Sequence, residues 1–295
     1  MVPLEDLKTG GKRAIARALS RLDRTNLTVE DAALLDEAFA APLGMVIGLT
    51  GPPGVGKSTL TQALIERLRA TGKSVAVIAV DPSSQKTGGA LLGDRTRLSL
   101  DPEDAKLFVR SLAARDRLGG LSDHAIAATM LLRALFDVVL VETVGIGQSD
   151  ADVALIADRS LLCVQPGSGD ALQFMKAGIM EWPDVIAVTK ADTGALARRA
   201  RADVEGALGL AAFDGQGPSV CLVSARTGDG VDELVSALVT DVKIDRQGQA
   251  EHLLDDAVTR RFGSHGASQL DTDAALHQAN GPFGAILQAA EKLSR

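Results

Sequence analysis

Short apolar runs that alternate with helical patterns constrain the fold of this 295-residue chain more than any other feature of its sequence. The runs are continuously apolar, which is typical of parallel strands that are buried on both faces. The predicted strands are 45–50, 75–80, 137–142, 160–164, 185–189 and 219–223. The helical patterns lie near 57–71, 121–135, 170–181, 194–208 and 231–240. This order predicts an α/β fold with a doubly wound, mostly parallel sheet.

The segments before and after the predicted sheet differ from it in character. The N-terminal segment has an apolar helical face made of Ile15, Ala18, Leu19 and Leu22, and a second helical pattern follows it. Beyond Val242 we expect helices at 251–262 and 284–294, separated by an irregular polar stretch that buries little core alone. The expected parts are an N-terminal helical extension (1–44), a sheet domain (45–243) and a C-terminal helical arm (244–295), which packs on the main domain or on another subunit.

Charge and hydropathy exclude several classes of partner. The net charge of −7 repels phosphate backbones and anionic lipid, so we expect no nucleic acid and no membrane partner. The N-terminus has no apolar signal region, and Arg133 and Asp137 interrupt the most apolar stretch. Cys163 and Cys221 lie in separate apolar runs and are predicted to be core side chains. We therefore expect a cytoplasmic protein.

The segment Gly51-Pro-Pro-Gly-Val-Gly-Lys-Ser58 fits the phosphate-binding pattern G-x-x-x-x-G-K-[ST] between a predicted strand and a predicted helix. Glycines at these positions let backbone N–H groups turn toward a phosphate at the positive end of the helix. Lys57 would bridge the β- and γ-phosphates, and the Ser58 hydroxyl would ligate Mg²⁺. The predicted nucleotide contacts are Gly51, Pro52, Pro53, Gly54, Val55, Gly56, Lys57, Ser58 and Thr59. The alternative, a glycine-rich turn with a chance lysine, does not explain why pattern, strand and helix agree.

Two carboxylates follow predicted strands and should reach the same edge of the sheet as this loop. Asp81 ends strand 75–80 and Glu142 ends strand 137–142. Either can hold Mg²⁺ directly or through water, although an Asp before Pro is also common as a turn or helix cap. Asp94 is a third candidate metal ligand. The Glu-x-x-Gly pattern that ends at Gly145 is typical of a switch whose N–H meets a γ-phosphate.

A further segment, Thr189-Lys190-Ala191-Asp192, follows strand 185–189 and matches [NT]-K-x-D. A carboxylate there can accept hydrogen bonds from the N1–H and N2–H₂ edge of guanine, which adenine cannot supply. The alternative is an ordinary surface Lys–Asp pair. The Thr189–Asp192 segment follows the phosphate loop and the Glu-x-x-Gly pattern in the sequence, and this order favours guanine binding over a surface ion pair. Ser224 and Ala225 follow the last predicted strand, where a backbone N–H commonly meets the guanine O6.

Taken together, these motifs closely resemble the methylmalonyl-CoA mutase-associated GTPase family, also labelled MeaB/ArgK, of the SIMIBI class of P-loop proteins. The resemblance covers roughly residues 10–240 and rests on TGPPGVGKST, AVDPSSQKTGGALLGDRTR, FVRSLAARDRLGGLS, VETVGIGQSD and TKAD. It implies a GTP- and Mg²⁺-binding chaperone that gates adenosylcobalamin loading and protection of a B12-dependent acyl-CoA mutase. It also implies a homodimer joined through the C-terminal arm.

The predicted catalytic residues are Lys57 and Glu142, from the motifs above, and Lys176, from the resemblance. Lys176 lies in segment 173–181, which resembles the family's partner-responsive switch and also fits an ordinary amphipathic helix. Gln148 either orients water or is solvated. Two features depart from the family: Thr189 replaces the usual Asn, and the tail after residue 245 is short and poor in the usual helical pattern.

Two other functions compete with the mutase chaperone. A metallochaperone GTPase would need clustered Cys and His, but the four histidines are dispersed. A P-loop kinase, as the family's lysine/arginine/ornithine transport label suggests, would need an acceptor pocket, and no separate substrate domain is evident.

Overall fold

The structure is a computed structural model. It describes residues 3–23, 27–81, 101, 103–113, 121–145, 153, 156–167, 183–210, 217–240, 242 and 244–294. The chain divides into two compact units. The sheet unit comprises Met45–Ala125 and Phe136–Lys243, and the helical unit comprises Met1–Gly44, Ile126–Leu135 and Ile244–Arg295.

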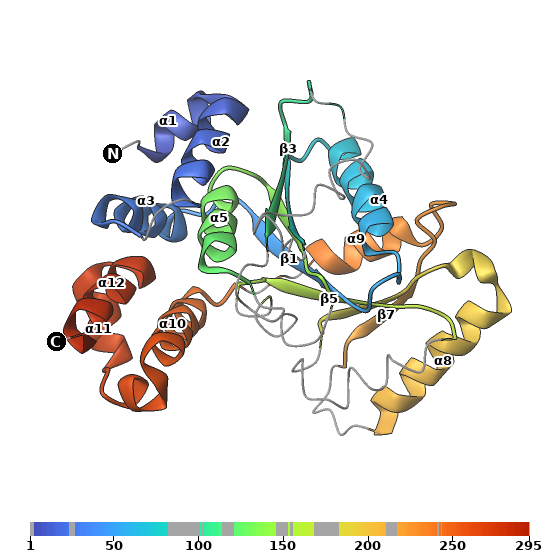
Figure 1. The fold of residues 1–295 in the computed structure, drawn as a ribbon. Coiled ribbons are helices and arrows are strands. Elements are labelled where there is room, and N and C mark those ends of the chain that lie inside the picture. Colours follow the sequence, from blue (N-terminus) through green and yellow to red (C-terminus); the bar gives the residue numbers. More distant parts are fainter. Residues whose placement is uncertain are drawn as a thin grey trace, which may run out of the picture. The chain divides into compact units, whose positions relative to one another are not determined.

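The sheet unit is built on seven strands in the order β3-β2-β4-β1-β5-β6-β7. Figure 1 labels β1, β3, β5 and β7 of this sheet. The strands are β1 (Met45–Thr50), β2 (Val75–Asp81), β3 (Leu107–Ala113), β4 (Val138–Glu142), β5 (Arg159–Val164), β6 (Val185–Val188) and β7 (Ser219–Leu222). Every pairing in this sheet is parallel. The predicted parallel α/β fold is therefore confirmed.

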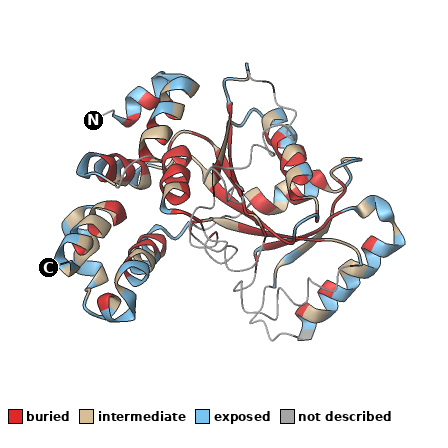
Figure 2. Ribbon diagram, viewed as in Figure 1, coloured by how far each residue is buried: buried red, intermediate tan, exposed pale blue. Residues whose placement is uncertain are grey.

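Helices pack on both faces of the sheet. On one face, α4 (Lys57–Ala70) and α9 (Val231–Val239) cover a core that includes Leu49, Leu140 and Leu161. On the opposite face, α8 (Ala195–Leu210) covers the smaller cluster around Leu162 and Val188. The central strands β1, β4, β5 and β6 are buried almost throughout, whereas buried and exposed positions alternate along the helices (Figure 2). The continuous apolar runs in the sequence follow from this two-sided burial.

One strand, β3, was not predicted. It lies at the edge of the sheet and pairs with β2 alone within the described sheet. Arg110 and Ser111 in its centre are only partly buried, so the apolar run that marks the other strands is missing. Charged and polar residues on an edge strand also protect it from pairing with other chains. The helix expected at 170–181 falls outside the described residues.

At the amino-terminal edge of the sheet, a carboxylate and a serine join neighbouring strands at two places. Asp137 Oδ2 accepts from the Ser74 backbone N–H at 2.7 Å and from its hydroxyl at 2.6 Å. Asp184 Oδ2 accepts from the Ser160 N–H at 2.7 Å and from its hydroxyl at 2.9 Å. The hydrogen bonds from Ser74, with the nearby Lys73 and Lys106 ammonium groups, lower the pKa of Asp137.

The helical unit contains α1 (Leu4–Thr9), α2 (Gly11–Leu22), α3 (Val29–Ala40), α10 (Arg246–Ser268), α11 (Thr272–Ala279) and α12 (Pro282–Leu293). It also takes in most of α5 (Asp123–Arg133). The apolar face predicted for α2 is buried at all four positions, Ile15, Ala18, Leu19 and Leu22. Among the described residues, no helix has the length and apolar character needed to cross a membrane.

The expectation of an irregular polar stretch between the two C-terminal helices was wrong. Helix α10 continues to Ser268 through a change of direction at Gly263, where φ is 71°. Helix α11 then begins because the Asp271 side chain accepts from the Ala274 N–H at 3.1 Å. Such a capping bond stabilises a short helix whose apolar pattern is weak. The tail also forms a core around Leu254, Val258, Ala285 and Ala289.

The two ends of the chain meet through a carboxylate on α3. Asp36 Oδ1 accepts from the Phe283 N–H at 2.8 Å, and Asp36 Oδ2 accepts from the Gly284 N–H at 2.9 Å. These N–H groups lie in the first turn of α12 and have no partner within that helix. Burial raises the pKa of Asp36, and the two backbone donors oppose this shift. Asp36 therefore caps α12 from a distant segment of the chain.

We predict that Asp137→Ala lowers the free energy of unfolding at neutral pH by about 1–3 kcal/mol, the usual contribution of hydrogen bonds to a charged group. Because the pKa of Asp137 is lowered in the folded state, its carboxylate stabilises the fold above the ordinary aspartate pKa. That contribution should be lost as the pH falls through the lowered pKa. Urea unfolding between pH 7 and pH 3 would measure it. The control is Asp203→Ala on the exposed side of α8, and a difference that stays constant with pH would contradict the assignment.

Candidate nucleotide-binding site

The pairing of β1 with β4 brings the two main motifs of the sequence together. In this register Leu49 lies opposite Glu142, and the segment Gly51–Ser58, the P-loop, begins two residues after Leu49. Val138, Leu140 and Glu142 alternate along β4 and share one face, because successive strand side chains point to opposite sides. Val138 and Leu140 are in the core that α4 covers. Glu142 is the next position on that face and so meets the start of α4.

The P-loop backbone requires glycine where it passes β5. Gly51 has a φ of 140°, and a Cβ there would lie 2.3 Å from the Cys163 carbonyl oxygen. The loop then leads directly into α4, which begins at Lys57. The first N–H groups of a helix have no partner inside it, so they face the space above the loop. Of the predicted nucleotide contacts, Gly51, Pro52, Val55 and Lys57 are buried, and Pro53, Gly54 and Thr59 are exposed.

Lys57 is buried against its own loop. Its ammonium donates to the Gly51 carbonyl at 2.6 Å and to the Pro52 carbonyl at 3.1 Å. Burial raises the pKa of the neighbouring Cys163 thiol to about 12, an effect that Lys57 opposes and Glu142 strengthens. Cys163 is therefore a protonated core side chain at neutral pH, as predicted. The site thus contains one buried cation close to one buried carboxylate.

Glu142 is held by two hydroxyl groups of α4. Ser58 Oγ donates to Glu142 Oε1 at 2.7 Å, and Thr61 Oγ1 donates to Glu142 Oε2 at 2.9 Å. Ser58 and Thr61 are three residues apart and so share a helix face. Glu142 as a whole residue is only 6% exposed, so these bonds form in a largely dry environment. Ser58 and Glu142, both predicted metal ligands, are in direct contact.

Gly145 lies against the P-loop. Its φ is 77°, and a Cβ at this position would lie 1.8 Å from the Gly51 carbonyl oxygen and 2.8 Å from Lys57 Nζ. Only glycine allows so close an approach together with this backbone conformation. The backbone between Glu142 and Gly145 is fixed in part by the Thr143 N–H, which donates to the Leu49 carbonyl at 3.0 Å. The structure thus brings the Glu-x-x-Gly pattern into contact with the loop.

The Thr189-Lys190-Ala191-Asp192 segment also reaches the P-loop. The Thr189 hydroxyl lies 2.8 Å from the Val55 carbonyl and 3.0 Å from the Val164 carbonyl and donates to this pair. A hydroxyl has a single hydrogen to share between them, whereas an Asn amide could donate two. The Lys190 ammonium donates to the Gly54 carbonyl at 3.1 Å and to Gln165 Oε1.

Asp192 is the central residue of a 3₁₀ turn (Ala191–Thr193) and contacts the loop that follows β7. The Ser224 hydroxyl donates to Asp192 Oδ1 at 2.9 Å, and Arg226 forms an ion pair with Asp192 Oδ2 at 2.9 Å. The bond from Ser224, with the charge of Arg226, lowers the pKa of Asp192. Its carboxylate is ionised at neutral pH and can accept hydrogen bonds.

Several predicted residues cannot be assessed. Asp94, Gln148 and the whole 173–181 segment with Lys176 lie outside the described residues. The backbone of Asp81 ends β2, but its side chain is also outside the description. The roles given to Asp81, Asp94 and Lys176 therefore remain predictions.

Three contacts of the site were missed in the sequence. Thr61 was identifiable as the residue one turn after Ser58 on α4. Gln165 follows the last residue of β5, and polar residues at strand ends of such sheets commonly face ligands. Arg226 directly follows Ser224 and Ala225, but no local pattern indicates its pairing with Asp192.

A match to a protein-family model shows the family to which the chain belongs. The family model described as methylmalonyl Co-A mutase-associated GTPase MeaB matches residues 13–261. The chain belongs to this family. The match includes all seven strands, the P-loop and most of α10, so MeaB similarity extends beyond the 10–240 range expected from the motifs.

Individual relatives agree with the MeaB assignment. A putative GTPase of Pyrococcus horikoshii is 44% identical over 193 residues, which are 64% of this chain and 60% of the archaeal protein. The mouse mitochondrial protein named methylmalonic aciduria type A homolog is 35% identical over 246 residues, 77% of this chain and 59% of the mouse protein. The chain thus spans about three-fifths of the length of these relatives.

Among solved structures, one titled LAO/AO transport system kinase aligns with a TM-score of 0.67 and 27% identity. The alignment covers 99% of this chain and 96% of that chain. Both the sheet and the helical ends of the chain are therefore included in the alignment with a solved structure.

We predict that Gly145→Ala weakens nucleotide binding by at least about tenfold, because the added Cβ pushes against the Gly51 carbonyl and the Lys57 ammonium. Isothermal titration with GTP and Mg²⁺ would measure the loss. Gly72→Ala is the matched control, since Gly72 has a similar φ of 83° but open space where a Cβ would lie. Equal affinities in the two variants would show that Gly145 does not limit the site.

Proposed function

We propose that this protein binds GTP with Mg²⁺ and hydrolyses it, and that the cycle gates adenosylcobalamin loading and protection of a B12-dependent acyl-CoA mutase. The observation that carries the nucleotide part is the contact of Glu142 with Ser58 and Thr61 beside the buried Lys57. Membership of the MeaB family supports both parts.

The P-loop supplies positive potential without covalent chemistry. Lys57 donates to two carbonyls of its own loop, and a triphosphate entering there would offer stronger, charged acceptors to the same ammonium. The N–H groups at the start of α4 add the partial positive charge of the helix end. Charge neutralisation of this kind lowers the barrier to phosphoryl transfer.

The residues beside Lys57 fit a magnesium ion. Ser58 Oγ and Glu142 Oε1 are 2.7 Å apart, and oxygen atoms of this kind are the ligands that Mg²⁺ prefers. These two residues would hold the ion, with Asp81 and Asp94 as further candidates. When bound, the ion would offset negative charge on the β- and γ-phosphates. Thr61 would keep the Glu142 carboxylate oriented through its bond to Oε2.

The base-binding side of the site supports GTP over ATP. Asp192 is an ionised acceptor, and Ser224 fixes one of its oxygens at 2.9 Å. Thr189 and Lys190 bond to Val55 and Gly54 of the P-loop, so the base-binding segment and the phosphate-binding loop form one connected surface. The Lys190 stem and the Ser224–Ala225 backbone would complete the guanine contacts.

We predict that Asp192→Asn reverses the base preference from guanine to xanthine. An amide presents one donor and one acceptor, which complements the xanthine C2 carbonyl and N1–H, whereas guanine offers two donors. The preference for GDP over XDP should fall by at least about 100-fold, the usual scale when a polar site loses its partner. Competition titration against a fluorescent guanine nucleotide would measure it. An unchanged preference would refute the role of Asp192.

The mutase partner is inferred from the family. Its description names an association with methylmalonyl-CoA mutase, and the mouse relative is named for methylmalonic aciduria. We further propose a homodimer that uses the C-terminal arm, of which α10, α11 and α12 are the described helices.

The partner is tested with the purified chain and the adenosylcobalamin-dependent acyl-CoA mutase of its source organism. We expect the mutase to form a complex that is tighter with a non-hydrolysable GTP analogue than with GDP, and to stimulate phosphate release from GTP. Lys57→Ala is the control, since loss of its ammonium should abolish phosphate release with and without the mutase. Slow phosphate release without any complex would retain the GTPase and reject the mutase as partner.

The two competing functions are less well supported. Among the described residues, no group of three or more His, Cys, Asp and Glu side chains is arranged to hold a metal ion. Burial keeps Cys163 protonated, so it is a poor metal ligand. Release of free phosphate from GTP without an added acceptor would argue against a kinase.

A further inference from the structure

The carboxylate of Asp192 is occupied on both oxygens in this structure. Ser224 Oγ donates to Oδ1 at 2.9 Å, and an Arg226 guanidinium nitrogen lies 2.9 Å from Oδ2. The Asp192 side chain is 22% exposed and that of Arg226 is 78% exposed. The ion pair thus covers part of the Asp192 carboxylate, which is itself only partly exposed to solvent.

Guanine and Arg226 compete for the same acceptor. Guanine presents two donors to a carboxylate, its N1–H and its N2–H₂, and so uses both oxygens. The hydroxyl of Ser224 brings a single neutral donor to Oδ1, and a carboxylate oxygen can accept a second bond. The Arg226 guanidinium is charged and larger than a hydroxyl, and its N–H groups have a fixed geometry. It therefore blocks Oδ2 more effectively than the Ser224 hydroxyl blocks Oδ1.

We propose that Arg226 is a specificity-determining residue that holds Asp192 while the site is empty and must leave it when guanine binds. The proposal rests on the proposed function, in which Asp192 binds guanine. Because the ion pair between Arg226 and Asp192 must break when guanine binds, Arg226 lowers the affinity of the protein for guanine nucleotides.

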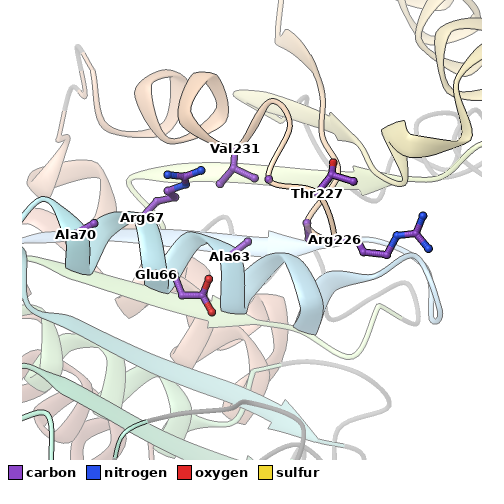
Figure 3. A pocket seen from close by; sticks show the side chains of 9 residues that line it. Ala63, Glu66, Arg67, Ala70, Arg226, Thr227 and Val231 are labelled. Carbon is purple, nitrogen blue, oxygen red and sulfur yellow. The ribbon is translucent and has the colours of Figure 1, made fainter.

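The fold provides space for the displaced side chain. A pocket of about 330 Å³ lies between α4 and the loop after β7, and Arg226 is part of its wall. Figure 3 shows the Arg226 guanidinium pointing away from Glu66 and Arg67, which come from α4. A rotation of the Arg226 side chain about its own bonds would turn it toward this pocket. Glu66, whose carboxylate accepts from Gln62 Nε2 at 2.7 Å, also lines the pocket.

The proposal distinguishes guanine from hypoxanthine, which lacks the 2-amino group and so presents one donor to the carboxylate. A hypoxanthine nucleotide can bond to Asp192 while Arg226 stays on the other oxygen. Arg226 should therefore penalise guanine nucleotides more than hypoxanthine nucleotides, and its removal should sharpen the discrimination between them.

The test is titration of GDP and IDP into wild-type protein, Arg226→Ala and Arg67→Ala. We expect Arg226→Ala to bind GDP about two- to fivefold more tightly, the range that an exposed ion pair contributes, with a smaller gain for IDP. Arg67→Ala is the matched control, because Arg67 lines the same pocket and pairs with Asp232 at 3.4 Å. It should bind both nucleotides as the wild type does.

The same substitution in an Asp192→Asn variant tests whether Arg226 acts by competing with the base for Asp192 or by a general change in the site. Asp192→Asn has no charge with which to hold Arg226, so adding Arg226→Ala to it should leave the affinity for XDP unchanged. If the wild type binds guanine nucleotides through Asp192 but Arg226→Ala binds GDP equally or more weakly, the inference is overturned. If wild-type protein shows no binding, or Asp192→Asn leaves base choice unaltered, the proposed function fails instead.

Discussion

The alignment of Leu49 on β1 with Glu142 on β4 positions most of the candidate nucleotide-binding site. It places a carboxylate on the face that α4 covers and brings the backbone that follows Glu142 against the P-loop. Because side chains alternate along a strand, a shift of one residue would turn Glu142 to the other face. The contacts of Ser58, Thr61 and Gly145 all depend on this register. The central position of β1, between β4 and β5, keeps the register fixed from both sides.

A second set of hydrogen bonds joins the Thr189–Asp192 segment to the P-loop. Thr189 and Lys190 donate to the Val55 and Gly54 carbonyls, so the segment predicted to bind the base is held against the loop predicted to bind the phosphates. Lys190 adopts a left-handed conformation, with φ 54°, that non-glycine residues rarely occupy. Strain of this kind is common at binding sites, where surrounding contacts maintain it.

The sequence predicted those features that depend on local pattern. Strands buried on both faces appear as continuous apolar runs, and the P-loop motif is contiguous, so both were identified. Strand β3 was missed because Arg110 and Ser111 interrupt its apolar character, and α11 because its start depends on the Asp271 cap instead of apolar periodicity. The ion pair between Arg226 and Asp192 joins two segments that are distant in the sequence, so no local sequence pattern predicts it.

The cap that Asp36 provides for α12 has a consequence for the order in which the chain acquires its structure. The bonded groups are 247 and 248 residues apart in the sequence. During synthesis every strand of the sheet has been made before Phe283 is added, whereas the Asp36 carboxylate still lacks its partners. The bonds of Asp36 to α12 can therefore form only after residues 283 and 284 have been synthesised, later than every strand of the described sheet. Long-range closure of this kind is slow compared with the formation of local helices.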